Sequence, residues 1–199
     1  MLTVFHAPQS RSSRMLWILE ELGADYQIHY CDIARRDGSG AADPANPHPD
    51  GKVPALSHDD VVVTESIAIT QYLTDLYPDA EISRPIGHVE RGAHLSWLAW
   101  YAGVFEPVMT FVFTGLGDNP ALHRTFRGRD EAFARIIGAL ERGPYLLGDR
   151  VSAVDVLMAD AGRAFRTLMP EGDLVDAYLA RMCDRPAFAI AQTKEFPPS

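Results

Sequence analysis

The chain of 199 residues carries a net charge of −9, and 47% of its residues are hydrophobic. This composition is typical of a soluble globular protein with a sizeable core, and the acidic balance, without any Lys/Arg cluster, excludes nucleic acid as an expected partner. The sequence contains no run of about 18 apolar residues, and its first residues, MLTVFHAP, lack the pattern of a secretory signal. We therefore expect no membrane partner and a cytoplasmic location.

The cysteines and histidines give no sign of a disulfide scaffold or a metal site. Cys31 and Cys183 lie far apart and form no CxxC motif. The histidines show no ligand spacing, and the Gly-x-Ser-x-Gly elbow of a hydrolase is missing. We expect both cysteines to be buried small side chains and the protein to hold no metal ion.

The first elements in the chain form a strand, a loop and a helix. Leu2 to His6 is a short apolar strand, and a polar loop from Gln9 to Ser13 follows. From Arg14 the apolar residues recur at helical spacing until Gly23, which is suited to end a helix. Tyr26 to Ile33 alternates as a second strand, so the unit should cross over right-handed to a parallel partner.

The stretch from Gly51 to Tyr77 predicts strand, turn, strand and helix, after an irregular, proline-rich segment from Arg35. Pro54 stands where a strand should begin, and proline donates nothing to a sheet ladder. A turn that presents backbone groups is therefore expected. The Val53-Pro54 bond is a candidate for cis geometry, although only about 5 to 6% of such bonds are cis.

Thr64, Glu65 and Ser66 stand at the start of the helix that closes this stretch. The free backbone N–H groups at a helix start favour an anion. Ordinary first-turn chemistry also explains an acidic residue and a serine there. The preceding Val-Pro turn favours a binding role for this pair.

The second half of the chain is helical in pattern. After a linker from Ala80 to Gly87, the segment Val89 to Phe113 is unusually aromatic, and Pro107 should kink it. A second long helix is expected from Phe126 to Leu140. The sequence Ser152-Ala-Val-Asp155 is a capping-box pattern that predicts a buried helix from Ala153.

These features together resemble the cytosolic glutathione S-transferases of bacteria. The resemblance rests on Lys52, Val53 and Pro54, then Glu65 and Ser66, in order and spacing, and on the segment from Tyr145 to Asp155. It implies an α/β thioredoxin-like N-terminal domain (βαβ-ββα) in residues 1–79 and an all-α helical bundle in residues 86–199. In thioredoxins the loop after the first strand carries Cys-x-x-Cys, but here it reads Ser10-Arg11-Ser12-Ser13, which excludes disulfide exchange there.

Glutathione, as the implied co-substrate, has two carboxylates, an α-ammonium and a thiol. By the resemblance, the Val53-Pro54 turn pairs with the cysteinyl backbone, Glu65 accepts the ammonium, and Ser66 binds the γ-glutamyl carboxylate. Lys52 can meet the glycyl carboxylate as a point charge. A solvated turn lysine explains Lys52 equally well, and His48 is an alternative.

The resemblance places the thiol-activating group in the loop after the first strand, where the family's tyrosine or cysteine is missing. Ser10 falls where serine-type transferases keep their hydroxyl, Arg11 can add positive charge, and Ser12 is the alternative. Ser12 or Ser13 can equally serve as a helix cap.

The substrate side of the prediction is coarser. Trp97, Trp100 and Tyr101 are candidates for an apolar pocket between the domains, although core or interface roles are commoner for such residues. We expect a homodimeric detoxification enzyme that lets the glutathione thiolate attack an electrophilic, mostly apolar substrate. The alternative is a non-catalytic protein of the same fold that acts through protein contacts.

Overall fold

The computed structural model describes residues 1–198 and divides the chain into two compact units. The first contains residues 1–83 together with the segment from Asp184 onward, and the second contains Arg84 to Cys183. The predicted division assigned all of residues 86–199 to the helical domain. The difference concerns the last helix, which packs within the first unit.

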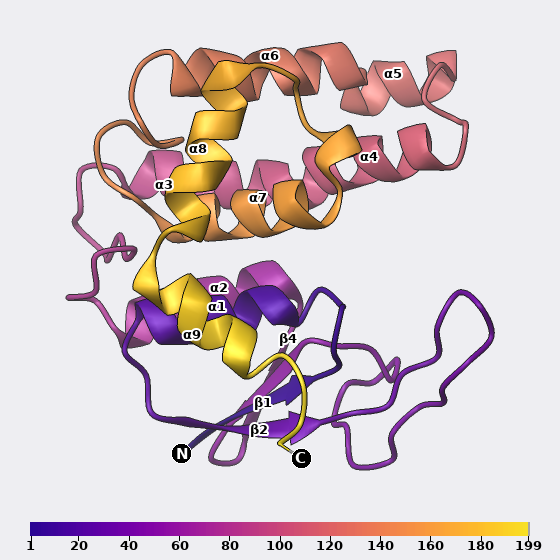
Figure 1. Ribbon diagram of the computed structural model, residues 1–199, viewed down its shortest axis with the longest axis vertical. Coiled ribbons are helices and arrows are strands. Elements are labelled where there is room, and N and C mark those ends of the chain that lie inside the picture. Colours follow the sequence, from indigo (N-terminus) through magenta and orange to yellow (C-terminus); the bar gives the residue numbers. More distant parts are fainter. Residues whose placement is uncertain (199) are drawn as a thin grey trace. The chain divides into compact units, whose positions relative to one another are not determined.

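The first unit is built on a four-stranded sheet with the order β2-β1-β3-β4 (Figure 1). The strands are β1 (Leu2–His6), β2 (Tyr26–Tyr30), β3 (Ala55–His58) and β4 (Val61–Thr64). β1 and β2 are parallel, whereas β3 is antiparallel to both of its neighbours. This is the predicted βαβ-ββα arrangement of a thioredoxin-like domain, and that prediction is confirmed.

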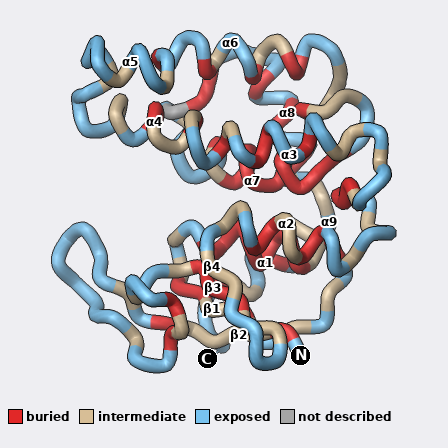
Figure 2. The backbone as a smooth tube through the Cα atoms, turned by 180° about the vertical axis from the view of Figure 1, so that it is seen from behind, coloured by how far each residue is buried: buried red, intermediate tan, exposed pale blue. Residues whose placement is uncertain are grey.

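Three helices accompany this sheet: α1 (Ser13–Glu21), α2 (Ser66–Leu76) and α9 (Pro186–Thr193). Helix α1 is buried along almost its whole length (Figure 2). It ends as predicted, with Gly23 at a positive φ of 61°, a conformation that glycine adopts without steric cost. Residues 35–51, all of which are described, form neither helix nor strand, as their prolines predicted.

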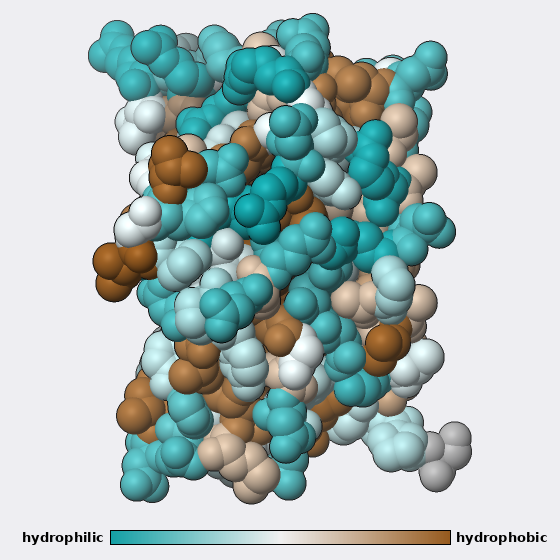
Figure 3. Space-filling view, turned by 90° about the vertical axis from the view of Figure 1, so that its left-hand side faces the viewer, coloured by the Kyte–Doolittle hydropathy of each residue, from teal (hydrophilic) through white to brown (hydrophobic). Residues whose placement is uncertain are grey.

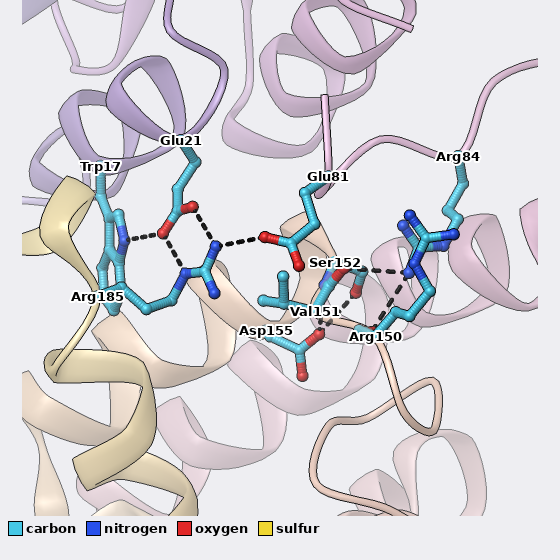
Figure 4. Close-up of polar contacts among 9 residues, drawn as sticks. All are labelled: Trp17, Glu21, Glu81, Arg84, Arg150, Val151, Ser152, Asp155 and Arg185. Carbon is cyan, nitrogen blue, oxygen red and sulfur yellow. Dashed lines mark hydrogen bonds and ion pairs between the residues drawn. The ribbon is translucent and has the colours of Figure 1, made fainter. Parts of the chain in front are cut away.

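Helix α9 joins the first unit through a partly buried ion pair and an aromatic contact. Arg185 donates two hydrogen bonds of 2.7 Å to the carboxylate of Glu21 on α1 and a third, of 2.9 Å, to Glu81 (Figure 4). The Trp17 ring of α1 packs on Phe188 at 4.6 Å between centroids. A bidentate Arg–carboxylate pair fixes orientation as well as distance, so these contacts explain why the end of the chain belongs here.

The second unit is helical throughout its regular elements. It contains α3 (Arg91–Trp100), a π-helical turn η1 (Tyr101–Phe105), α4 (Glu106–Phe113), α5 (Pro120–Phe126), α6 (Arg129–Leu140), α7 (Ala153–Ala164), a 3-10 turn η2 (Arg166–Leu168) and α8 (Asp173–Cys183). The π turn lies just before Pro107, where the sequence predicts a kink. The predicted start of the helix at Phe126 is wrong. Arg127 has a φ of 64°, which is not helical, so α5 ends at Phe126 and α6 begins at Arg129.

The core of the second unit depends on Asp155 in the first turn of α7. Its carboxylate is fully buried and accepts hydrogen bonds from the backbone N–H and the hydroxyl of Ser152, each at 2.8 Å (Figure 4). It also accepts the backbone N–H of Leu146 at 2.8 Å and the hydroxyl of Tyr178 at 3.2 Å. The reciprocal capping-box contacts between Ser152 and Asp155 that the sequence predicts are present, and the Ser152 hydroxyl in addition lies 2.8 Å from the Asp155 carboxylate. Helix α7 begins at Ala153 as predicted.

The predicted linker from Ala80 to Gly87 is more ordered than a spacer. Arg84 is 1% exposed and donates to the carbonyls of Val151 and Arg150 at 3.1 and 3.3 Å and to Glu90 at 2.6 Å. The guanidinium therefore satisfies backbone carbonyls just before α7.

Figure 3 shows one face of the molecule, on which hydrophilic side chains dominate and hydrophobic ones form separate patches. Among the described residues no helix is long and apolar enough to cross a membrane.

Candidate functional site

Strand register brings three predicted segments to one end of the sheet. Phe5 near the end of β1 is paired with Ala55 at the start of β3, and Ala55 is paired with Thr64 at the end of β4. The loop after β1, the turn at Pro54 and the helix start at Glu65 therefore follow directly from three neighbouring strand ends. The sequence predicted these three segments separately, and the sheet places them side by side.

The turn before β3 has the conformation that was a candidate in the sequence. The Val53-Pro54 bond is cis, and Pro54 is buried. The side-chain amide of Asn46 donates to the carbonyl of Lys52 at 2.9 Å, which fixes the backbone just ahead of the turn. The Lys52 side chain itself is 73% exposed and lies 3.7 Å from the Asp50 carboxylate.

The alternative residue His48 has a structural task of its own. It is buried, and its Nδ1 accepts the backbone N–H of Asp50 at 3.1 Å.

Besides Lys52, a second cation, Arg35, lies near this end of the sheet and was missed by sequence reasoning. Its guanidinium donates to the carbonyl of Pro8 at 3.1 Å, so it lies at the loop after β1. Only the fold brings Arg35 to this place, because 27 residues separate the two partners.

Glu65 occupies an unusual backbone conformation at the start of α2. Its φ is 69° and its ψ is 123°, a region that non-glycine residues rarely adopt and that costs about 1 to 3 kcal/mol. The Glu65 side chain is exposed, whereas Ser66 is half-buried as the first residue of the helix. Strain that the surrounding structure maintains is typical of ligand-binding positions. The first N–H groups of α2 lie beside it and form the positive end of the helix dipole.

The loop after β1 holds three serine hydroxyls, and two of them are committed to other partners. Ser12 is fully buried, and its Oγ lies 2.7 Å from His6 Nδ1. The Ser13 hydroxyl donates to the carboxylate of Glu195 at 2.8 Å. Ser10 is half-buried, with its Oγ 2.8 Å from the carbonyl of Ala7 and 2.7 Å from Ser12 Oγ.

The tautomer of His6 decides the direction of the Ser12 hydrogen. His6 Nε2 lies 3.0 Å from the backbone carbonyl of Glu195, which can only accept, so Nε2 carries the proton. Burial lowers the pKa of His6, so the ring is neutral at pH 7 and its Nδ1 is an acceptor. Ser12 therefore donates to Nδ1 and accepts the N–H of Ala7 at 3.0 Å. The Ala7 carbonyl, at 3.3 Å, is the longer alternative acceptor.

Of the three hydroxyls, only that of Ser10 can be redirected to a ligand without breaking a contact to another element. Its hydrogen has two nearby acceptors within its own loop, and hydroxyl hydrogens rotate freely. Arg11 is exposed on the same loop. The arrangement can thus offer one hydrogen-bond donor and one positive charge to an anion.

Sequence reasoning missed His6 and Glu195 as supports of the loop. Glu195 is 8% exposed, and its Oε1 accepts the N–H of Gln9 at 2.6 Å as well as the Ser13 hydroxyl. Within residues 1–198 its Oε2 has no hydrogen-bond partner. The two residues are 189 positions apart, and no local pattern links them.

The aromatic candidates belong to the second unit and differ in burial. Tyr101 is fully buried and packs on Phe105 at 5.5 Å between ring centroids. Trp97 is also buried, whereas Trp100 is half-buried, and the guanidinium of Arg135 lies 4.4 and 4.5 Å from the two indole centroids. Trp100 is therefore the one of these three aromatic residues with a partly exposed ring. The contact with the two indole rings removes the Arg135 guanidinium partly from water, and this desolvation lowers the pKa of Arg135.

Comparisons with known proteins agree with the geometry. The sequence model of the glutathione S-transferase N-terminal domain matches residues 1–75. The chain is 27% identical to glutathione S-transferase GstA of Escherichia coli O157:H7, over 96% of this chain and 98% of that protein. It is similar to a glutathione transferase structure from Methylococcus capsulatus, with 31% identity, 98% of both chains covered and a TM-score of 0.76. A theta-class glutathione S-transferase from Xanthomonas axonopodis with glutathione bound is 27% identical over 96% of both chains, with a TM-score of 0.71.

The buried, neutral imidazole of His6 predicts an acid-sensitive fold. Below the ordinary histidine pKa of about 6.5, the unfolded chain binds a proton that the folded chain does not bind. The free energy of unfolding should therefore fall as the pH drops, by up to about 1.4 kcal/mol per pH unit for this group. The variant His6→Gln keeps a hydrogen-bond donor and an acceptor but cannot bind the proton. Its free energy of unfolding, measured in urea between pH 7 and 5, should therefore fall less steeply than that of the wild type.

The exposed histidine variant His123→Gln serves as the control and should keep the wild-type decline. Carboxylates that also titrate in this range contribute to all three proteins and cancel in the comparison. An identical pH dependence in His6→Gln and wild type would contradict the neutral, buried state.

Proposed function

Because the chain belongs to the glutathione S-transferase family, and is a transferase of that type, we propose that it binds glutathione in its first unit, stabilises the thiolate and promotes attack on an electrophilic, mostly apolar substrate. The observation that carries this proposal is the register that joins the Val53-Pro54 turn, the strained Glu65 and the Ser10 loop at one sheet end. In the reaction the thiol proton leaves to solvent, the thiolate sulfur donates a lone pair to form a bond to the electrophilic carbon, and the bond from that carbon to its leaving group breaks, so that the leaving group departs with the electron pair.

The γ-glutamyl end of glutathione fits the start of α2. Glu65 supplies an exposed carboxylate for the α-ammonium, and Ser66 with the first N–H groups of the helix suits the carboxylate. The backbone of Val53, beside the buried Pro54, is left to pair with the cysteinyl part. Lys52 and Arg35 are the two cations that can meet the glycyl carboxylate, while the engagement of His48 with Asp50 makes it a weaker alternative.

Ser10 is our candidate for the thiolate donor, with Arg11 as electrostatic support. Ser12, the alternative named from the sequence, is disfavoured because its hydrogen is directed to His6 and its side chain is buried. The role of Ser12 is instead to hold Ser10, since the two hydroxyl oxygens are 2.7 Å apart. For the apolar substrate we propose the half-buried ring of Trp100, supported by the buried Trp97, which contacts it directly, and by the buried Tyr101, which contacts it through Phe105.

We also propose a detoxification role in the cytoplasm. The half-buried Trp100 ring, with the Arg135 guanidinium 4.5 Å from its centroid, is the surface that we propose for electrophilic substrates. The cysteines Cys31 and Cys183 are both free thiols, which is usual for proteins of reducing compartments.

Glutathione binding is tested by two single substitutions. Glu65→Ala and Ser66→Ala should each weaken glutathione by about 1.5 to 3 kcal/mol, because each removes one charge-assisted hydrogen bond. Isothermal titration measures the affinity directly. Glu141→Ala and Ser96→Ala, exposed positions in the second unit, are the matched controls and should bind like wild type. Unchanged affinity in both site variants would show that the γ-glutamyl end binds elsewhere.

The thiolate donor is tested by the pH dependence of turnover. Ser10→Ala should raise the apparent pKa of the bound thiol, which is about 8.5 for a free cysteine, and so shift the rate profile to higher pH. Glutathione affinity should stay within severalfold of wild type. Ser12→Ala should chiefly lower stability, because it leaves His6 Nδ1 and the Ala7 N–H without their partner.

A silent Ser10→Ala together with a shifted profile in Ser12→Ala or Arg11→Ala would move the role to that residue. If none of the three shifts the profile, a water or a backbone N–H is the donor, and the proposal for Ser10 is wrong.

We propose a homodimer as the assembly. Each unit exposes apolar side chains that a partner copy can cover: Val61 and Val62 on β4 are 54% and 47% exposed, and Val89 and Leu95 at α3 are 94% and 39% exposed. Light scattering at micromolar concentration should give twice the chain mass. A monomeric mass would refute the proposal.

A further inference from the structure

A group of metal-ligating side chains lies at the carboxyl end of β2 and is not used by the proposed reaction. His29 is the fourth residue of β2 and Cys31 follows the strand, so the two are separated by one residue and lie on the same face. Asp43 comes from the irregular segment 35–51. One ligand atom from each of the three lies within 4.8 Å of the other two.

The contacts within the group are already well ordered. His29 Nε2 lies 3.1 Å from Asp43 Oδ2, while Asp43 Oδ1 accepts the N–H of Ala45 at 2.8 Å. The backbone N–H of Cys31 donates to the carbonyl of His6 at 2.7 Å, which fixes the backbone that carries the thiol, and the thiol itself lies 3.7 Å from the carbonyl of His29. Outer hydrogen bonds of this kind hold ligands in place in metal sites.

The same three residue types can form a nucleophilic centre, but the environment argues against one. Cys31 is 7% exposed, and burial together with the nearby Asp43 carboxylate raises the pKa of its thiol to about 11. A reactive cysteine needs a lowered pKa and access to its substrate. Here the Asp43 carboxylate bonds to His29 and also lies beside the thiol, whereas in a nucleophilic triad the histidine stands between the nucleophile and the carboxylate.

We propose that His29, Cys31 and Asp43 form a binding site for a divalent transition-metal ion, with Zn²⁺ as the best match. Imidazole nitrogen, thiolate sulfur and carboxylate oxygen are the ligands that zinc combines in proteins. The His29 side chain is 38% exposed, so a fourth position is open to water. Sequence spacing could not predict the site, because Asp43 reaches the strand end only through the fold.

The present spacing requires only a small adjustment. Zinc bonds of about 2.0 to 2.3 Å in a tetrahedral arrangement place ligand atoms about 3.3 to 3.6 Å apart. The pair of His29 and Asp43 is close to that separation already, so the sulfur has to approach by about one ångström. A bound ion would tie the segment 35–51 to the end of β2.

The experiment uses Co²⁺ as a spectroscopic probe of the full chain, in a phosphine reductant and without glutathione, because thiol compounds bind the ion themselves. Wild type should bind one equivalent with a thiolate-to-cobalt charge-transfer band in the near ultraviolet, and Zn²⁺ should displace it. Cys31→Ser should abolish the band, and His29→Gln and Asp43→Asn should each weaken Co²⁺ binding by about tenfold or more.

Cys183→Ser, at the other free cysteine, and Asp37→Asn, at an exposed carboxylate of the same segment, should bind like wild type. Circular dichroism checks that each variant is folded, and His29→Gln and Asp43→Asn retain the thiol if Cys31→Ser is unstable. Absence of the band in wild type, its persistence in Cys31→Ser, or binding unchanged in both other ligand variants would overturn the proposal. None of these outcomes depends on transferase activity.

Discussion

The buried imidazole of His6 has to satisfy two nitrogens away from water, and this requirement joins three parts of the chain. Nε2 bonds to a backbone carbonyl in the C-terminal segment, and Nδ1 bonds to the serine loop. A buried polar group without a partner costs about 1 to 3 kcal/mol, so the strand, the loop and the tail stabilise one another. The state of one ring therefore sets the hydrogen-bond direction in the loop where we place the chemistry.

The position of the C-terminal segment follows from contacts farther along α9. The bidentate pair of Arg185 and Glu21 fixes this helix on α1, and Glu195 then comes to the loop. The carboxylate of Glu195 holds the N–H of Gln9, a residue at φ 56°, and so helps maintain an unusual backbone conformation. The order of this loop therefore depends on a residue that lies 186 positions away from Gln9 in the sequence.

Much of the fold and part of the site could be predicted from the sequence because their signals are local. The Val53-Pro54 turn, the hairpin after it and the helix start at Glu65 are each recognisable from residues close together in the sequence. The strand pattern between them predicts that the turn and the helix start lie at the same end of the sheet. The supports of the loop could not be predicted in this way. His6 reads as an ordinary strand residue and Glu195 as a polar tail residue, and only tertiary packing across 189 positions joins them.

The metal ligands illustrate the same limit at shorter range. His29 and Cys31 are visible as a same-face pair, yet two ligands do not define a site, and Asp43 stands in a segment without periodicity. Periodic patterns in the sequence predict where strands and helices lie, but they do not predict the course of an irregular segment such as the one that carries Asp43. Side-chain chemistry that depends on such a segment can be recognised only once its path is known.

The charges around the serine loop explain why the thiolate needs a dedicated donor. Glu195 brings a negative charge to Gln9 and Ser13, which opposes a second anion nearby. Arg11 and the positive N-terminal end of α1, which starts at Ser13, act in the opposite direction. Since Glu195 occupies the Ser13 hydroxyl and His6 occupies that of Ser12, neither hydroxyl remains to offset the repulsion. The hydroxyl of Ser10 is then the one side-chain donor of the three serines that a thiolate can recruit without loosening the loop that holds it.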